Sequence, residues 1–424
     1  MRKIIFSAVI GLIVITASPY GTVEPWWKAA FVCAVFAICI VAIIDALISG
    51  NDRINGASIL LPMLALSVLA FLQSATTISA DPFQTRFFAL QMLALTTFLA
   101  LLYRYGATEQ RVRILVYTVL AIAVASAIFG ILRQTTQHQT GFVLPLLKPN
   151  QGYGQFINKN HFAYLMEMAF GLGLGIIITG DIAKDRLMIY VALLLPIWTA
   201  LVLANSRGGV LAMLAEIILA TLLLLSVRAD VPRSRSLRAA LLSILIIGVL
   251  VGTLWVGGDR LAGNLAATTT ELSTESTREG ASRNEIWRAS AKMFAAHPIL
   301  GAGLGGYWIG ITAYHEASGV MTPQEAHNDY LELLSSGGLI GLAIGVWFGV
   351  MVIREARKNL FLETGFLHAA RVGAVLGIAG VAAHSLVDFG LHMIANAVVF
   401  LTLIMIVTTK ISSDKSVDLN TKAP

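Results

Sequence analysis

Long apolar runs separated by short basic loops fill nearly the whole 424-residue chain, and this alternation limits the folds that it can adopt. Only 13% of the residues are charged and 57% are hydrophobic, so the charged side chains are too few to cover the surface of a soluble protein. Each run is continuous, and a helix needs about 20 apolar residues to cross a bilayer. Transmembrane β-strands would instead appear as short alternating segments. The sequence therefore predicts an all-α polytopic membrane protein.

The hydropathy pattern predicts about twelve transmembrane helices in a single integral membrane domain that covers residues 1–424. Their centres lie near residues 12, 38, 66, 95, 122, 169, 195, 217, 247, 341, 379 and 400. With the N-terminus inside, the inside segments hold nineteen Lys and Arg residues and the short outside segments hold six. Basic residues favour the cytoplasmic side, so we expect both termini in the cytoplasm. The net charge of +6 arises from these loops and does not indicate a nucleic-acid partner.

Two of the predicted outside loops are long, one at residues 133–159 and a larger one at residues 257–326. The first half of the larger loop is rich in Thr, Glu and Ser. In its second half, Ile286, Trp287 and Phe294 recur at helical spacing. We expect a short amphipathic helix there, lying near the outer leaflet.

Three arginines in these outside segments are candidate ligands of an anion. Arg207 lies in a turn between two spans, and Arg283 and Arg288 flank Trp287. A guanidinium group suits the geometry of phosphate. Since Arg283 and Arg288 are five residues apart, only one is expected to face a site, and Arg283 is favoured. The alternative is that these arginines contact lipid headgroups only.

His327 begins a predicted span beside Asn328, and histidine can accept and return a proton near neutral pH. This makes His327 a candidate general base, with a simple capping or interfacial role as the alternative. Lys159 and His161 end the first long loop and are candidates for the same site.

His384 and Asp388 lie near the outside end of the eleventh predicted span, four residues apart, so we expect them to share a helical face. Ionisable groups in a membrane usually face the interior of the bundle. Asp388 can orient a histidine or neutralise an arginine there, and a hydrogen bond between packed helices is the alternative.

Glycine patterns in the chain indicate structure rather than cofactor chemistry. The segment 301–306 matches G-x-G-x-x-G, but no βαβ unit surrounds it, so we expect a bend beneath His327. Gly171 and Gly175, four residues apart in one span, favour close helix packing. The outside segments contain no Asp-x-Asp pair and no Cys/His cluster, so we expect neither a metal nor a cofactor.

Several segments together resemble the O-antigen ligase and polymerase superfamily of bacterial membrane glycosyltransferases. They are residues 158–163, 206–209, 283–287, 298–306, 326–341 and 384–388. The resemblance extends over about residues 150 to 400, and it is the combination that is specific. It implies a twelve-helix fold in the bacterial inner membrane, with a large periplasmic loop that covers the active site.

The resemblance also implies that the donor glycan is carried on undecaprenyl diphosphate and is transferred to a hydroxyl group without nucleotide sugar or metal. The acceptor is the lipid A–core in ligases, a second lipid-linked glycan in polymerases, and a protein Ser or Thr in a third branch. His327 would then be the general base, and Arg207 and Arg283 would hold the diphosphate, with Arg288 as the rival of Arg283. Asp388 would support the site.

A transporter or flippase of lipid-linked oligosaccharides is the competing interpretation, because twelve spans suit transporters as well. Such a protein typically has repeated halves and polar groups at the middle of the membrane. This chain gathers its outside ionisable residues near one surface, which favours the enzyme. The sequence does not distinguish a ligase from a polymerase.

Overall fold

The structure, a computed structural model, describes residues 1–18, 20–50, 56–136, 147, 152–179, 184–226, 248, 283–315, 323–362 and 364–411. Eight of the helices in this part of the chain are long and apolar enough to cross a membrane. The described residues therefore form an all-α polytopic membrane protein. Apart from Gly248, the predicted span near residue 247 lies outside the described residues. So do residues 257–282 of the larger loop and residues 412–424.

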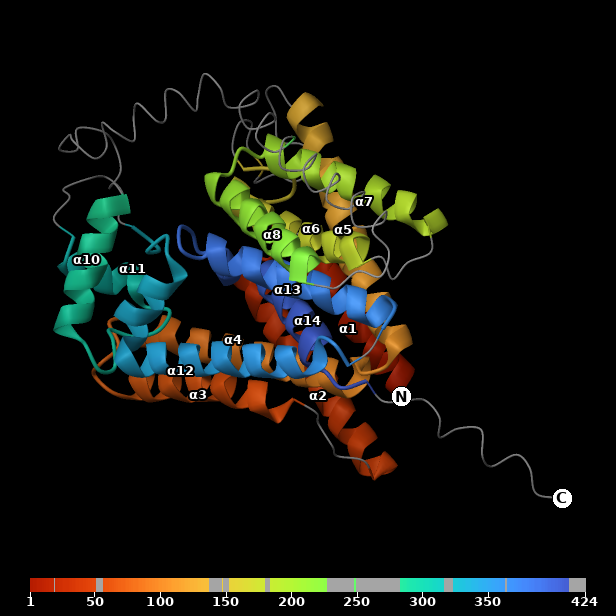
Figure 1. Ribbon diagram of the computed structural model, residues 1–424. Helices are drawn as coiled ribbons and strands as arrows, with labels where there is room; N and C mark the ends of the chain where they lie inside the picture. Colours follow the sequence, from red (N-terminus) through yellow and green to blue (C-terminus); the bar gives the residue numbers. More distant parts are fainter. Residues whose placement is uncertain are drawn as a thin grey trace.

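Eleven of the predicted span centres each fall inside one of the described helices (Figure 1). These helices are α1 (Arg2–Ala17), α2 (Pro25–Ser49), α3 (Ala57–Ala75), α4 (Pro82–Gly106), α5 (Glu109–Thr136), α6 (Lys159–Thr179), α7 (Lys184–Leu203), α8 (Arg207–Ser226), α12 (Asp329–Asn359), α13 (Phe366–His384) and α14 (Ile394–Thr408). The predicted amphipathic helix is also present, as α10 (Arg283–Ala296), and is followed by the short helices α11 (Tyr307–Gly310) and η1 (Ile311–Ala313). A short 3-10 helix, η2 (Gly390–His392), precedes α14.

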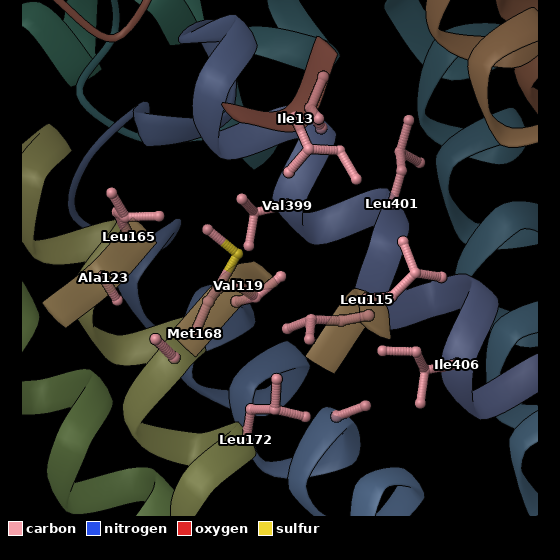
Figure 2. Packing of buried hydrophobic residues seen from close by; sticks show 14 of the residues in the cluster. Ile13, Leu115, Val119, Ala123, Leu165, Met168, Leu172, Val399, Leu401 and Ile406 are labelled. Atoms are coloured by element: carbon pink, nitrogen blue, oxygen red, sulfur yellow. The ribbon is translucent and has the colours of Figure 1, made fainter. Parts of the chain in front are cut away.

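Helix α6 lies at the centre of the bundle, where 94% of its most apolar window is buried. Its glycines permit the close contact with α13, as predicted. A Cβ on Gly171 would lie 2.5 Å from the nitrogen of Gly377, and one on Gly175 would lie 2.2 Å from the Cα of Gly373. Figure 2 shows side chains of α5, α6 and α14 packed together in the hydrophobic core. Helix α6 is therefore closely packed on the helices around it, and its first turn lies at one end of the bundle.

Helix α12 is interrupted at Gly338, whose φ of 64° and ψ of −164° are not helical. The backbone groups freed by the break bond to the glycine-rich segment that follows α10: Leu339 N–H donates to Pro298 O (2.9 Å), and Gly303 N–H donates to Ser336 O (3.0 Å). Gln73 of α3 also donates to Ser336 O (2.9 Å). Broken helices are tolerated in membranes only where the freed groups find such partners. The predicted bend at residues 301–306 is present, since Gly301, Gly303 and Gly305 all have a positive φ, and residues of this segment and Pro298 bond to the start of α12.

The loops that the sequence assigns to the outside meet at one end of the bundle. Ala80, between α3 and α4, donates its N–H to Ala302 O at 2.9 Å. Lys159 at the start of α6 donates to Asn205 O, between α7 and α8, at 2.9 Å. Helices α10 and α11 cover the same end (Figure 1). The candidate residues from distant parts of the sequence are thereby brought into one region.

Candidate active site

His327 lies in the turn that leads into α12, and its neighbours hold its backbone in place. Asn328 caps the helix, since its Oδ1 accepts a hydrogen bond from Leu331 N–H at 3.0 Å. On the other side, Ala326 N–H donates to Glu332 Oε2 at 2.9 Å. Between these anchors the backbone of His327 has a φ of 51°, a left-handed conformation that residues other than glycine rarely adopt. Strained residues of this kind cluster at functional sites.

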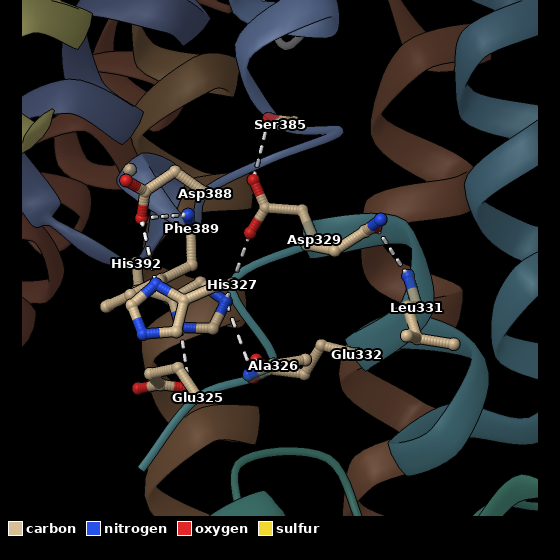
Figure 3. Close-up of polar contacts among 12 residues, drawn as sticks. Glu325, Ala326, His327, Asp329, Leu331, Glu332, Ser385, Asp388, Phe389 and His392 are labelled. Atoms are coloured by element: carbon tan, nitrogen blue, oxygen red, sulfur yellow. Dashed lines mark hydrogen bonds and ion pairs between the residues drawn. The ribbon is translucent and has the colours of Figure 1, made fainter. Parts of the chain in front are cut away.

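The imidazole of His327 faces the carboxylate of Asp388, with 3.5 Å between Nδ1 and Oδ1. This is an ion-pair distance and is longer than an ordinary hydrogen bond. Asp388 is only 1% exposed, and its other contacts are Phe389 N–H, which donates to Oδ1 at 2.9 Å, and the side-chain amide of Asn160. The His327 side chain is 33% exposed, so its second ring nitrogen can be reached from outside. Figure 3 shows the arrangement.

The carboxyl group of Asp388 is held in its charged form. Burial favours the neutral acid, but the contact with His327 and the N–H of Phe389 outweigh burial and lower its pKa to about 2. This carboxylate faces Nδ1 of His327 and therefore favours the tautomer of His327 in which Nδ1 carries the proton. The lone pair of Nε2 is then free to accept a proton.

The ring of Phe389 lies among three histidines. The centroids of His161 and His327 are each 4.9 Å from that of Phe389, and the centroid of His392 is 5.7 Å away. His161 lies in the first turn of α6 and is only 6% exposed. His161 therefore packs on Phe389 next to His327, in a position where it can support the site as predicted but is not exposed to a substrate.

A second ionic cluster lies beside His327 and was not foreseen from the sequence. His392 Nδ1 is 3.4 Å from Glu325 Oε2, while its Nε2 is 3.5 Å from Asp329 Oδ1 and 3.7 Å from Glu332 Oε1. Burial disfavours a charged His392, but Glu332 and Glu325 outweigh burial and raise its pKa to about 10. Reciprocally, His392 outweighs the effect of burial on Glu325 and lowers the pKa of that carboxyl group. The imidazolium therefore joins η2 to the start of α12.

The same cluster contains donor atoms that suit a divalent cation. One ligand atom each from Glu325, Glu332 and His392 lies within 4.8 Å of the others, whereas the sequence analysis expects no metal site. An imidazole must lose its proton before it can bind a metal. With a pKa near 10, His392 is itself the cation among these carboxylates at neutral pH. The cluster is best described as an ion-pair network around a charged histidine.

Replacing His392 by glutamine is expected to destabilise the protein most at mildly acidic pH. The folded-state pKa of about 10 lies above the value of about 6.5 in an unfolded chain. The ion pairs therefore contribute fully below about pH 6.5, and their contribution is lost as the pH rises through about 10. The difference in apparent melting temperature between wild type and H392Q in detergent should shrink between pH 6 and pH 10.5. A difference that does not change with pH would contradict the charged state of His392.

Arg207 is the first residue of α8 and its side chain is exposed. The helix begins here because Ser206 acts as the N-cap, with its Oγ accepting Gly209 N–H at 3.1 Å. The hydrogen bond from Lys159 Nζ to Asn205 O ties this turn to α6. The adjacent Asn160 contacts Asp388, the partner of His327. Arg207 and His327 are thus connected at the same end of the bundle.

Arg283 and Arg288 lie on different faces of α10. The buried face carries Ile286, Ser290 and Met293, and Trp287 beside it donates Nε1–H to Ala326 O at 3.0 Å. Arg283 precedes Trp287 by four residues, so both lie on the side of the helix that meets the His327 segment. Arg288 follows Trp287 directly and lies away from the buried face. Both arginines are exposed, and the geometry favours Arg283 for a shared site.

His384 and Asp388 do not share a helical face, contrary to the expectation from their spacing. Helix α13 ends at His384, and Asp388 lies in the following turn, where its own Oδ1 accepts Phe389 N–H. His384 is fully buried, and its Nδ1 lies 2.8 Å from Glu167 Oε2. Sequence analysis missed Glu167, although an acidic residue inside an apolar span is itself a signal of function.

Comparison with known proteins adds an independent observation. Residues 191–346 match a family model described as O-Antigen ligase. The match includes Arg207, α10 and His327, which the structure places at one end of the bundle. No curated protein sequence matches the chain. This match supports the resemblance of the chain to the O-antigen ligase family.

Proposed function

We propose that this protein transfers a glycan from undecaprenyl diphosphate to an acceptor hydroxyl at the periplasmic face of the bacterial inner membrane. The observation that carries the proposal is the His327–Asp388 pair, at 3.5 Å, in a region joined to Arg207 through Asn160 and Lys159. A base and a phosphate-binding group at one end of a helix bundle suit a substrate that is part lipid and part polar.

In the proposed reaction, His327 is the general base. Its Nε2 removes the proton of the acceptor hydroxyl while the acceptor oxygen attacks the anomeric carbon of the donor sugar. The bond between that carbon and the phosphate oxygen breaks, and undecaprenyl diphosphate leaves with the electron pair. The imidazolium is stabilised by Asp388 and later releases its proton to water. Direct attack inverts the anomeric centre, which NMR of donor and product linkages can establish.

The leaving diphosphate is proposed to bind Arg207 and Arg283. Diphosphate is already a good leaving group, so the protein mainly positions it and stabilises its charge. Arg207 is the first residue of α8, and the dipole at a helix N-terminus favours an anion at this position. Arg283 approaches from α10, which Trp287 anchors to the residue before His327. No nucleotide cofactor or metal takes part in this step.

A transfer assay with purified protein in lipid nanodiscs tests the proposal. The donor is a glycan on undecaprenyl diphosphate, and the acceptors are lipid A–core and a second lipid-linked glycan, each with and without EDTA. We expect a glycosylated acceptor by mass spectrometry in both conditions. If no acceptor is modified, but the protein moves the donor across the bilayer of proteoliposomes, the protein is instead a transporter or flippase.

Product analysis of a deletion strain identifies the acceptor. Loss of all polymer from lipid A–core indicates a ligase, and single-repeat caps indicate an O-antigen polymerase. Unchanged lipopolysaccharide with loss of another surface polysaccharide indicates a polymerase of that glycan. Each outcome leaves the reaction type the same and names the second substrate.

Arg283→Ala and Arg288→Ala are a matched pair of variants, because each removes an exposed arginine of α10. We expect them to affect transfer to different extents. A charged hydrogen bond to phosphate contributes about 1.5–3 kcal/mol, so R283A should lower kcat/KM for the donor about 10- to 100-fold. R288A should remain within about twofold of wild type, because Arg288 lies away from the Trp287 side of α10. Steady-state kinetics at saturating acceptor measures both. Equal losses, or a larger loss in R288A, would reverse the assignment.

A further inference from the structure

A fully buried, hydrogen-bonded Glu–His pair lies within the membrane-spanning helices. Glu167 of α6 and His384 of α13 are both 0% exposed, and 2.8 Å separates Glu167 Oε2 from His384 Nδ1. Ionisable residues inside a membrane are costly and are usually kept for function. Neither side chain reaches the exposed surface where the acceptor and the diphosphate would bind. The role of the pair must therefore be exerted through the residues that it contacts.

On one side, the His384 ring packs against the start of α8. A Cβ on Gly208 would lie 2.2 Å from both Cδ2 and Nε2 of His384, so the ring rests directly on this backbone. Gly208 is the neighbour of Arg207. The ring of Tyr164 of α6 also stacks on His384, with centroids 4.0 Å apart and an interplanar angle of 18°. The His384 ring is thus in direct contact with the first turn of α8, which carries Arg207.

On the other side, His384 is the last residue of α13 and leads directly to the residues that hold the base. Ser385 Oγ donates to Asp329 Oδ2 at 2.6 Å, and Asp329 N–H donates to Ser385 O at 3.0 Å. Asp329 follows His327 by two residues. Asp388 N–H donates to His384 O at 3.1 Å. The residues that follow α13 therefore include Asp388, the partner of His327, and Ser385, which holds the start of α12 through Asp329.

We propose that Glu167 is a positioning residue that, through His384, sets the separation between Arg207 and His327. This inference rests on the function proposed above. Glu167 fixes the His384 ring, and the ring and its backbone contact the two elements that hold the diphosphate ligand and the base. A displacement of about 1 Å between reacting groups can lower a rate about 100-fold. Glu167 would then affect transfer without touching either substrate.

Glu216 of α8 provides a matched control within the same bundle. It is also 0% exposed in a membrane-spanning helix, and it packs against Gly380 of α13. Neither of its carboxyl oxygens has a hydrogen-bond partner among the described residues. Replacing Glu216 likewise removes a fully buried carboxyl group from the core, but it breaks no contact to His384 that the structure describes.

The test compares E167L, E167Q, E216L and G208A in the nanodisc transfer assay, with folded protein quantified by size-exclusion chromatography. We expect E167L to lower kcat at least about 10-fold, and E216L to stay within about twofold of wild type. E167Q should recover most of the activity, because the Gln oxygen still accepts the Nδ1–H of His384. G208A should resemble E167L, because its new methyl group displaces the same ring.

Two further readouts separate positioning from a general loss of stability. The pH–rate profile of E167L should keep its shape while its plateau falls, because Asp388 still faces His327. E167L and G208A should be non-additive in a double-mutant cycle, since both act through His384. If E167L does not fold, G208A decides alone, and wild-type kcat in G208A overturns the inference. Full activity in folded E167L overturns it too, whereas an inactive wild type overturns the proposed function itself.

Discussion

Replacing His327 by alanine is expected to lower kcat for glycan transfer about 10²- to 10⁴-fold, the usual contribution of a positioned general base. The substitution removes Nε2, the ring nitrogen that does not face Asp388, from a side chain that is 33% exposed. Membrane insertion should be unaffected, because the spans that surround the site do not depend on this side chain. The measurement is the initial rate with purified protein at saturating donor and acceptor.

Two companion variants make this result specific to the base. His327→Asn keeps a side chain that tolerates the left-handed backbone at φ 51° but cannot act as the base, so it should be as inactive as H327A. His297 follows α10 and contacts Tyr314, not Asp388, so His297→Ala should retain wild-type activity. Full activity of H327N would refute the role of His327 as base.

Arg207→Lys is expected to reduce kcat/KM for the donor well below wild type, and Arg207→Ala should lose about 100-fold or more. Lysine keeps the charge but loses the planar, two-pronged geometry with which a guanidinium group binds phosphate. Alanine removes the charge as well, leaving only the dipole at the N-terminus of α8. Kinetics at varied donor concentration, and binding of undecaprenyl diphosphate, measure both variants. An unchanged rate in R207K would remove the diphosphate assignment.

The helices and their order were predictable from local sequence because each span is one continuous apolar run. Eleven predicted centres fall within described helices, and the spacing of Ile286, Trp287 and Phe294 predicted α10. Gly171 and Gly175 likewise predicted a close helix contact, which proves to be with α13. Such signals depend only on residues that are near one another in the chain.

The ionic contacts of the site were less predictable, because they join residues far apart in the sequence. Nothing local pairs His392 with Glu325, or Asn160 with Asp388. The spacing of His384 and Asp388 was misleading, because α13 ends at His384. The His384 side chain is buried against Glu167, whereas Asp388 faces His327. Glu167 was overlooked because a single acid hardly changes the hydropathy of its span.

The most direct test of the central claim is the position of the donor diphosphate in a cryo-EM structure of the protein with undecaprenyl diphosphate in nanodiscs. We expect the diphosphate to contact the guanidinium group of Arg207, with Nε2 of His327 facing the side from which an acceptor would attack. Diphosphate bound at the opposite end of the bundle, or in a cavity at the middle of the membrane, would contradict the claim and favour transport.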